Sequence, residues 1–198
     1  FPLGQECCGA LAAHTGRPGR AARLQRRNER AFGSPAATGP IVVEAAGCGQ
    51  ELKAYGPEFS SRVVDAVALL AGSGASAHRS VPLRVAFHDP CHARHGQGVV
   101  APPRQLLSAI PDLTWYEATE KEVCCGSGGA WGLRYPKMSA DLARRKAADL
   151  AEGGADLVVT TNPGCLGQIA DGLALEAPGL PILPLTDLWW YATRTENP

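Results

Sequence analysis

The sequence lacks the features that assign many small proteins to a class. It contains no C-x₂₋₄-C pair of the kind that structural zinc sites usually have. No apolar run reaches the roughly 18 residues of a membrane-spanning helix, because Asp65 and the prolines near the C-terminus interrupt the longest runs. Charge is balanced, with 19 lysines and arginines against 19 aspartates and glutamates. We therefore expect no direct membrane span and no nucleic-acid partner, and any peripheral membrane association would come through partner proteins.

Seven cysteines are present without a secretory signal or a small disulfide scaffold. Free thiols of this kind favour a reducing compartment, so we expect a cytoplasmic protein. The 198 residues, 45% of them hydrophobic, suffice for a core without disulfide bridges. The sequence opens on Phe1, close to a motif, and is interpreted as a fragment or a processed piece.

Two adjacent cysteines followed by glycine occur twice, in "ECCGA" and in "VCCGS". Neighbouring cysteines bridge each other only through a strained ring, so a disulfide is not their expected role. In each motif another cysteine follows the second thiol after 40 positions, which pairs Cys8 with Cys48 and Cys125 with Cys165. A shift of 117 residues superposes the two sets, and it also superposes the apolar run at 41–43 on 158–160. The sequence therefore predicts two tandem copies of one unit.

Short strands alternating with helices indicate an α/β fold, with two tandem CCG-type repeats of short parallel sheets flanked by helices. We expect a truncated first repeat at 1–72, a linker at 73–82 rich in small residues, and a complete second repeat at 83–198. The expected helices lie at 18–32, after 47, at 103–110, at 136–152 and after 164, and the expected strands at 41–44, 83–87, 114–117 and 157–160. The C-terminal tail is read as a strand leading into an aromatic helix that contains Trp189, Trp190 and Tyr191.

Four cysteines of the second repeat follow predicted strands. Cys91 comes after the strand at 83–87, Cys124 and Cys125 after the strand at 114–117, and Cys165 after the strand at 157–160. Open parallel sheets build their sites at the carboxyl ends of strands, so these thiols are expected to converge. Four thiolates are suited to an iron–sulfur cluster or to Zn²⁺. Adjacent cysteines without a C-x₂₋₄-C pair favour the cluster, while buried cysteines without a metal remain the blander alternative.

Three residues beside these cysteines are candidates to tune the centre. His88 and His92 flank Cys91 and are expected to contact the sulfurs, although a simple turn at Asp89 is the competing interpretation. Gly126, with the glycines after it, would let backbone N–H groups approach an anion.

The first repeat offers Cys7, Cys8 and Cys48 as an incomplete set, because the counterpart of Cys91 would fall before Phe1. The segment Arg144, Arg145 and Lys146 is expected on a solvated helix face.

"FHDPCHARHGQGV", "CCGSGG" and "NPGCLGQI" together resemble the cysteine-rich CCG domain of the glycolate oxidase iron–sulfur subunit. The same domain is found in heterodisulfide reductase and in lactate-utilisation iron–sulfur proteins. The resemblance implies an electron-transfer subunit with [4Fe–4S] clusters that works beside flavin-containing oxidase subunits. It does not imply which 2-hydroxy acid is oxidised.

One departure from the family limits what the resemblance implies. In the heterodisulfide reductase branch the last motif is C-x-x-C, and its final cysteine serves a noncubane cluster that cleaves disulfides. Glu51 and Gln168 stand at that position here. Electron relay is therefore favoured over a thiol–disulfide oxidoreductase, over a role in a lactate-oxidising complex and over a zinc scaffold.

Overall fold

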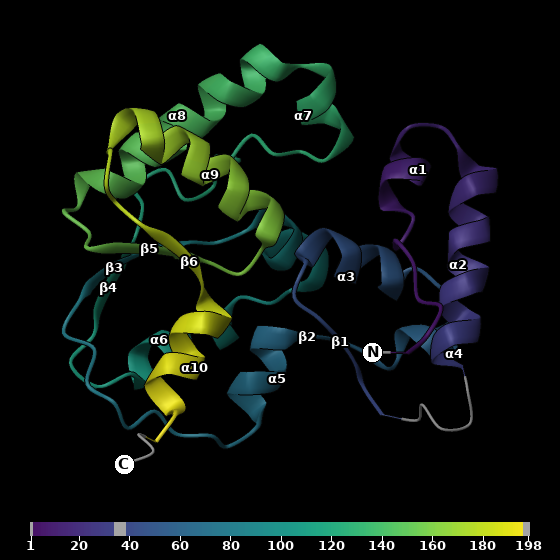
Figure 1. The fold of residues 1–198 in the computed structure, drawn as a ribbon, viewed down its shortest axis with the longest axis horizontal. Coiled ribbons are helices and arrows are strands. Elements are labelled where there is room, and N and C mark those ends of the chain that lie inside the picture. The colour runs from purple at the N-terminus through teal and green to yellow at the C-terminus, as the bar shows by residue number, and fades with distance from the viewer. Residues whose placement is uncertain (1, 34–38, 196–198) are drawn as a thin grey trace.

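The computed structural model describes residues 2–33 and 39–195, and residues 1, 34–38 and 196–198 of the expected repeats lie outside this description. Figure 1 shows an α/β fold with two parallel sheets, as predicted. The elements, in chain order, are α1 (Ala10–His14), α2 (Pro18–Phe32), β1 (Ile41–Val43), α3 (Ala46–Lys53), α4 (Pro57–Ser60), β2 (Val63–Asp65), α5 (Ala66–Gly72), β3 (Arg84–His88), the π-helical turn η1 (His92–Gly96), α6 (Ala101–Ala109), β4 (Thr114–Glu117), α7 (Ala130–Arg134), α8 (Pro136–Glu152), β5 (Leu157–Thr160), α9 (Pro163–Glu176), β6 (Ile182–Pro184) and α10 (Leu185–Thr193).

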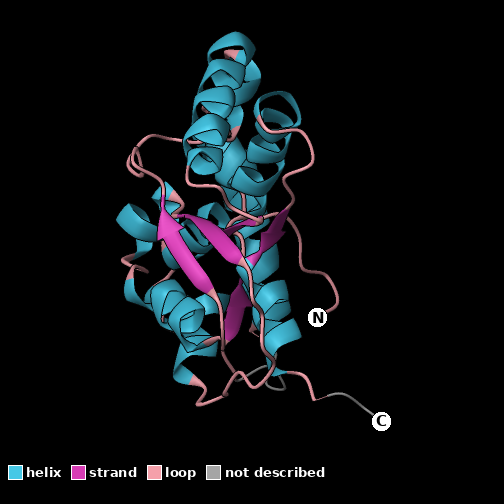
Figure 2. Ribbon diagram, turned by 90° about the vertical axis from the view of Figure 1, so that its left-hand side faces the viewer, coloured by secondary structure: helices cyan, strands magenta, loops and turns pink. Residues whose placement is uncertain are grey.

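The larger sheet has the strand order β4-β3-β5-β6, and every neighbouring pair is parallel. Alternate residues of β3 and β5 face opposite sides, as a strand requires. Phe87 and Val159 pack with α5, α6 and α10 on one face, whereas Ala86 and Val158 pack with α8 and α9 on the other. Figure 2 shows these helices around the strands. Because both faces are covered, the strands are apolar almost throughout.

The smaller sheet reproduces half of this arrangement in the first copy. Strand β1 pairs in parallel with β2, placing Ile41 opposite Val63, and β5 pairs with β6 in the same way, placing Val158 opposite Ile182. The shift of 117 residues carries β1 onto β5, so the second strand of each pair is also part of the repeat. Sequence analysis did not predict β2, because its three residues run directly into the apolar helix α5.

Helix α5 follows the first copy in sequence and packs in the core of the second. Val67 is buried in the same apolar cluster as Phe87 and Trp189. After α5 the chain takes an irregular path through the expected linker, and the backbone N–H of His78 bonds to the carbonyl of Ala192. The two copies therefore share buried surface.

Two expectations about surface residues need correction or division. Lys146 does not lie on a solvated face: its side chain is 1% exposed, its Nζ donates to the Glu120 carbonyl, and it lies 3.5 Å from Asp149 Oδ2. Burial of an ammonium is costly unless it is paired in this way.

The neighbours Arg144 and Arg145 are exposed, as expected, and form ion pairs with Glu176 and Glu120. Trp189 is buried in the core, whereas Trp190 and Tyr191 are exposed.

No helix in the described ranges is both long enough and apolar enough to cross a membrane.

Close contact between α8 and α9 depends on glycine. A Cβ at Gly172 would lie 2.5 Å from the Ala143 carbonyl oxygen, whereas a Cβ at Gly167 on the same helix would meet nothing within 4 Å. We expect Gly172→Ala to destabilise the fold by about 2 kcal/mol through overpacking. Gly167→Ala is the matched control and should stabilise it by about 0.5 kcal/mol, since alanine favours helix. Urea unfolding measures both, and equal effects would contradict the packing described here.

Candidate metal centre

Three strand ends of the larger sheet deliver their loops to one pocket. Cys91 follows β3, Cys124 and Cys125 follow the loop after β4, and Cys165 stands in the first turn of α9 after β5. All four line a single pocket. Because β3, β4 and β5 are parallel and adjacent, their carboxyl ends share one edge of the sheet. The structure thus brings the four cysteines together, and their role as ligands stays a prediction.

The four sulfurs form a hydrogen-bonded chain that shares protons. Cys124 is bonded to both Cys91 and Cys125, and Cys125 is also bonded to Cys165. The Cys125 and Cys91 thiols hold the pKa of Cys124 far below its ordinary value. Hydrogen bonding to Cys125 first, and then His88, lowers the pKa of Cys165 to about 5.

Cys91 and Cys125 behave in the opposite way, because their hydrogen bonds to Cys124 and their burial raise their pKa values. Four thiolates so close together repel one another. Full ionisation of the set therefore needs a cation among the sulfurs.

His88 reaches this set directly. Its residue is 4% exposed, and a ring nitrogen lies within 4.8 Å of a group that also contains the Cys125 and Cys165 sulfurs. Its Nε2 is buried without a hydrogen-bond partner among the described residues. A buried imidazole nitrogen facing sulfur is suited to ligate a metal or to donate to a metal-bound sulfur.

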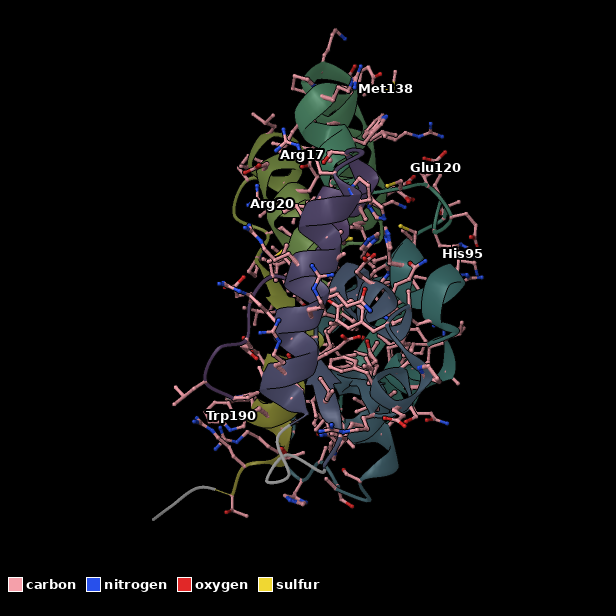
Figure 3. All side chains as sticks on the ribbon, turned by 90° about the vertical axis from the view of Figure 1, so that its right-hand side faces the viewer. Arg17, Arg20, His95, Glu120, Met138 and Trp190 are labelled. Atoms are coloured by element: carbon pink, nitrogen blue, oxygen red, sulfur yellow. The ribbon has the colours of Figure 1, made fainter. Side chains whose placement is uncertain are left out.

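The other two histidines of this loop differ from His88. His92 Nδ1 lies 3.6 Å from Cys91 Sγ. His95 is exposed at the edge of the molecule (Figure 3), where its Nε2 lies 3.3 Å from Glu122 Oε2. His88 and His92 thus contact the sulfurs, and His95 belongs to the rim.

Gly126 shapes the loop that presents Cys124 and Cys125. Its φ is +90°, and a Cβ there would lie 2.4 Å from the Ser139 carbonyl oxygen. In this conformation its N–H points at Cys124 Sγ, 3.4 Å away. The first copy repeats the geometry, with Gly9 at φ +94° and its N–H 3.5 Å from Cys7 Sγ. Only glycine adopts this backbone at low cost.

Gln168, at the position of the second cysteine in a C-x-x-C motif, supports this loop from behind. Its Nε2 donates to Ser139 O at 3.1 Å and to Ser139 Oγ at 3.0 Å, and Ser139 Oγ donates to Gly126 O at 2.8 Å. The amide is therefore committed to backbone support.

An ion-pair network that sequence analysis missed holds the turn before Cys91. Asp89, whose side chain is 1% exposed, accepts from Arg94 Nη1 at 3.1 Å and from Arg104 Nη2 at 2.7 Å. Arg104 also pairs with Glu117 at the end of β4. The network thereby joins the β3 and β4 ends. Its signal in the sequence is the pattern of a buried strand leading into an aspartate, which sequence analysis interprets only as a turn.

The first copy places its own cysteines together. Cys8 Sγ lies 3.2 Å from Cys48 Sγ, and Cys7 is exposed beside them. The Cys8 thiol lowers the pKa of Cys48 to about 7, whereas the bond to Cys48 and burial raise that of Cys8. Glu51 is close enough for its charge to raise both pKa values.

Asn162 is a second residue that sequence analysis missed. Its Nδ2 donates to Cys165 Sγ at 3.1 Å, and its Oδ1 accepts from the backbone N–H of Ala46 at 3.1 Å. Its signal is the asparagine directly before Pro163 in "NPGC", a favoured helix N-cap.

Comparison with known proteins fits this cysteine geometry. A family model described as a CCG cysteine-rich domain matches residues 1–53 and 85–170. The chain belongs to the CCG family. Within the family, it is 36% identical over 196 residues to a subunit of the fumarate reductase (CoM/CoB) of Methanothermobacter marburgensis, covering 94% of this chain and 39% of that protein. It is 31% identical over 192 residues to the probable glycolate oxidase iron–sulfur subunit of Bacillus subtilis, covering 89% of this chain and 43% of that protein.

A third CCG relative is a subunit of the dihydromethanophenazine:CoB–CoM heterodisulfide reductase of Methanosarcina acetivorans, 29% identical over 187 residues, covering 86% of this chain and 46% of that protein. The chain therefore spans less than half the length of these three relatives. Their names place the chain in a family of iron–sulfur subunits of oxidoreductases.

The residues present fit an iron–sulfur group. Soft thiolates are the ligands that such clusters take. Four of them share one pocket, and the buried nitrogen of His88 faces the same sulfurs without another partner in the described chain.

The backbone at Gly126 can be tested without a metal. We expect Gly126→Ala to destabilise the protein by about 3 kcal/mol, because a Cβ there meets a carbonyl oxygen at a positive φ. Gly154→Ala is the control: φ is +68° but the space is open, so about 1 kcal/mol is expected. Thermal or urea unfolding measures both. A smaller loss for Gly126→Ala than for Gly154→Ala would contradict the loop geometry.

Proposed function

We propose that the protein is a one-electron relay, in which Cys91, Cys124, Cys125 and Cys165 hold a [4Fe–4S] cluster. The observation that carries this proposal is the convergence of these four thiols on one pocket at the carboxyl edge of a parallel sheet. The cluster would supply reversible one-electron chemistry. The chain's own residues would hold it, shield it with the buried Cys125 and Cys165, and donate hydrogen bonds to its sulfurs.

The proposed setting is a glycolate oxidase type of complex in the cytoplasm, where flavin-containing subunits oxidise a 2-hydroxy acid and pass on the electrons. The glycolate oxidase name of the Bacillus subtilis relative supports this setting. Among the described residues, no group in the pocket is arranged to take a hydride, since the pocket is lined by thiols and by a rim of charged side chains. The oxidation itself is therefore assigned to the partner.

The competing function is direct cleavage of a disulfide at the cluster, which the heterodisulfide reductase relative brings into consideration. Gln168 argues against it, because the position of the additional cysteine holds an amide that is bonded to Ser139. A relay needs no such ligand. It needs only a shielded cluster near the surface, and the half-buried Cys91 and Cys124 provide that exposure.

Iron analysis after anaerobic purification tests the proposal. We expect brown protein with about four irons and four sulfides per chain. Cys125→Ser should lose the iron and destabilise the second copy, because metal-binding free energy also stabilises the fold. Cys8→Ser should keep the iron, since Cys7, Cys8 and Cys48 are expected to form an incomplete site.

His95→Ala is the control for changes at the pocket rim and should also keep the iron, because His95 contacts Glu122. Colourless protein with one zinc per chain would contradict the relay. Loss of all iron in Cys8→Ser would show that the two copies share ligands. An EPR signal that appears only when a disulfide is added to oxidised protein would favour disulfide chemistry instead.

A further inference from the structure

The side chain of Asn162 does not perform the task that its position suggests. Asn162 is the N-cap residue of α9, where asparagine normally accepts a hydrogen bond from its own helix. Here it makes no such cap. It contacts Cys165 Sγ and the N–H of Ala46 instead, 116 residues away. Local helix formation therefore does not account for the residue.

We propose that Asn162 is a positioning residue that orients the Cys165 sulfur, raises the reduction potential of the cluster held there and joins this centre to the first copy. The proposal rests on the proposed function, because it concerns the cluster assigned to Cys91, Cys124, Cys125 and Cys165.

The partners of Asn162 determine which way its amide points. A backbone N–H can only donate, so the group facing Ala46 must be the carbonyl oxygen. The amide nitrogen is then directed at Cys165, 3.1 Å from its sulfur. A flipped amide would set two donors against each other at Ala46. The N–H donor to sulfur is thus a consequence of the contact with the first copy.

That contact is part of a close junction between α3 and η1. Gln97 Nε2 donates to the Ala46 carbonyl at 2.9 Å. Gly49 and Gly96 allow the approach, since a Cβ on either would meet a glutamine of the facing element within 3 Å. Ala46 is fully buried there. Helix α3 also carries Cys48, so the Asn162 amide connects the cysteine sets of the two copies.

The repeat provides an internal comparison. The shift of 117 residues places Ala45 at the position of Asn162. Ala45 is likewise the N-cap of its helix but has no amide to donate to Cys48. The donor is therefore particular to the second centre, and the repeated fold does not require it.

A donor to a cluster sulfur favours the reduced state, because the added electron increases the negative charge on the sulfurs. Removal of the N–H should lower the reduction potential. Asn162→Ala removes both contacts. Asn162→Asp keeps an acceptor for Ala46 but replaces the donor with a negative charge, so it should lower the potential further. Asn162→Ser, whose hydroxyl retains one donor, should lie between wild type and Asn162→Ala.

The experiment is an EPR-monitored redox titration of the anaerobically purified, iron-loaded protein and its variants. We expect the potential to fall in the order wild type, Asn162→Ser, Asn162→Ala, Asn162→Asp. Gln97→Ala is the matched control, because it loosens the same junction with α3 without touching Cys165, and it should keep the wild-type potential.

Each outcome has a defined meaning. Wild-type potentials in Asn162→Ala and Asn162→Asp overturn the proposal, as does an equal shift in Gln97→Ala, which would indicate a merely structural effect. If one Asn162 variant does not retain iron, the order of the remaining variants decides. A wild-type protein that binds no iron refutes the proposed function itself, and is thereby distinguishable from a failure of this inference.

Discussion

Repulsion between thiolates is the constraint on which this structure depends. The parallel sheet brings four cysteines to one edge, where they can remain together only if they share protons or hold a cation. The opposed pKa shifts of Cys124 and Cys125 express this conflict, since one sulfur accepts hydrogen bonds and the other donates them. A metal cluster resolves the conflict, because it neutralises all the sulfurs at once. The N–H of Gly126 and the imidazole of His88 contribute in the same direction.

The repeat shows which parts of this solution can vary. Both copies keep the positive φ of the glycine after the paired cysteines. Their loops, however, are supported differently. In the first copy Asn28 accepts from the Glu6 N–H and donates to the Cys7 carbonyl, while Tyr55 donates to the Cys8 carbonyl. In the second, Ser139 and Gln168 support Gly126. Backbone conformation is thus common to both copies, and the side chains that stabilise it are not.

Sequence analysis predicted the α/β class and most elements within a few residues, because periodicity and the duplicated cysteines are local signals. It also predicted the convergence of the four cysteines, since strand ends of a parallel sheet must meet. It missed β2, whose three residues resemble the start of the following helix. It missed Asp89 with Arg104 and Asn162 with Ala46, because those partners are distant in sequence. It misplaced Lys146, since the burial of a lysine depends on an acceptor that only the tertiary structure provides.

Helix α5 has a consequence for how the chain opens. Its sequence continues the first copy, but Val67 and Leu70 pack against the core that contains Phe87 and Leu107. The first copy cannot detach as a unit without exposing part of that core to solvent. Amides in β3 and β5 and those in α5 should therefore exchange with solvent through a common opening event, so that the two repeats behave as one cooperative unit.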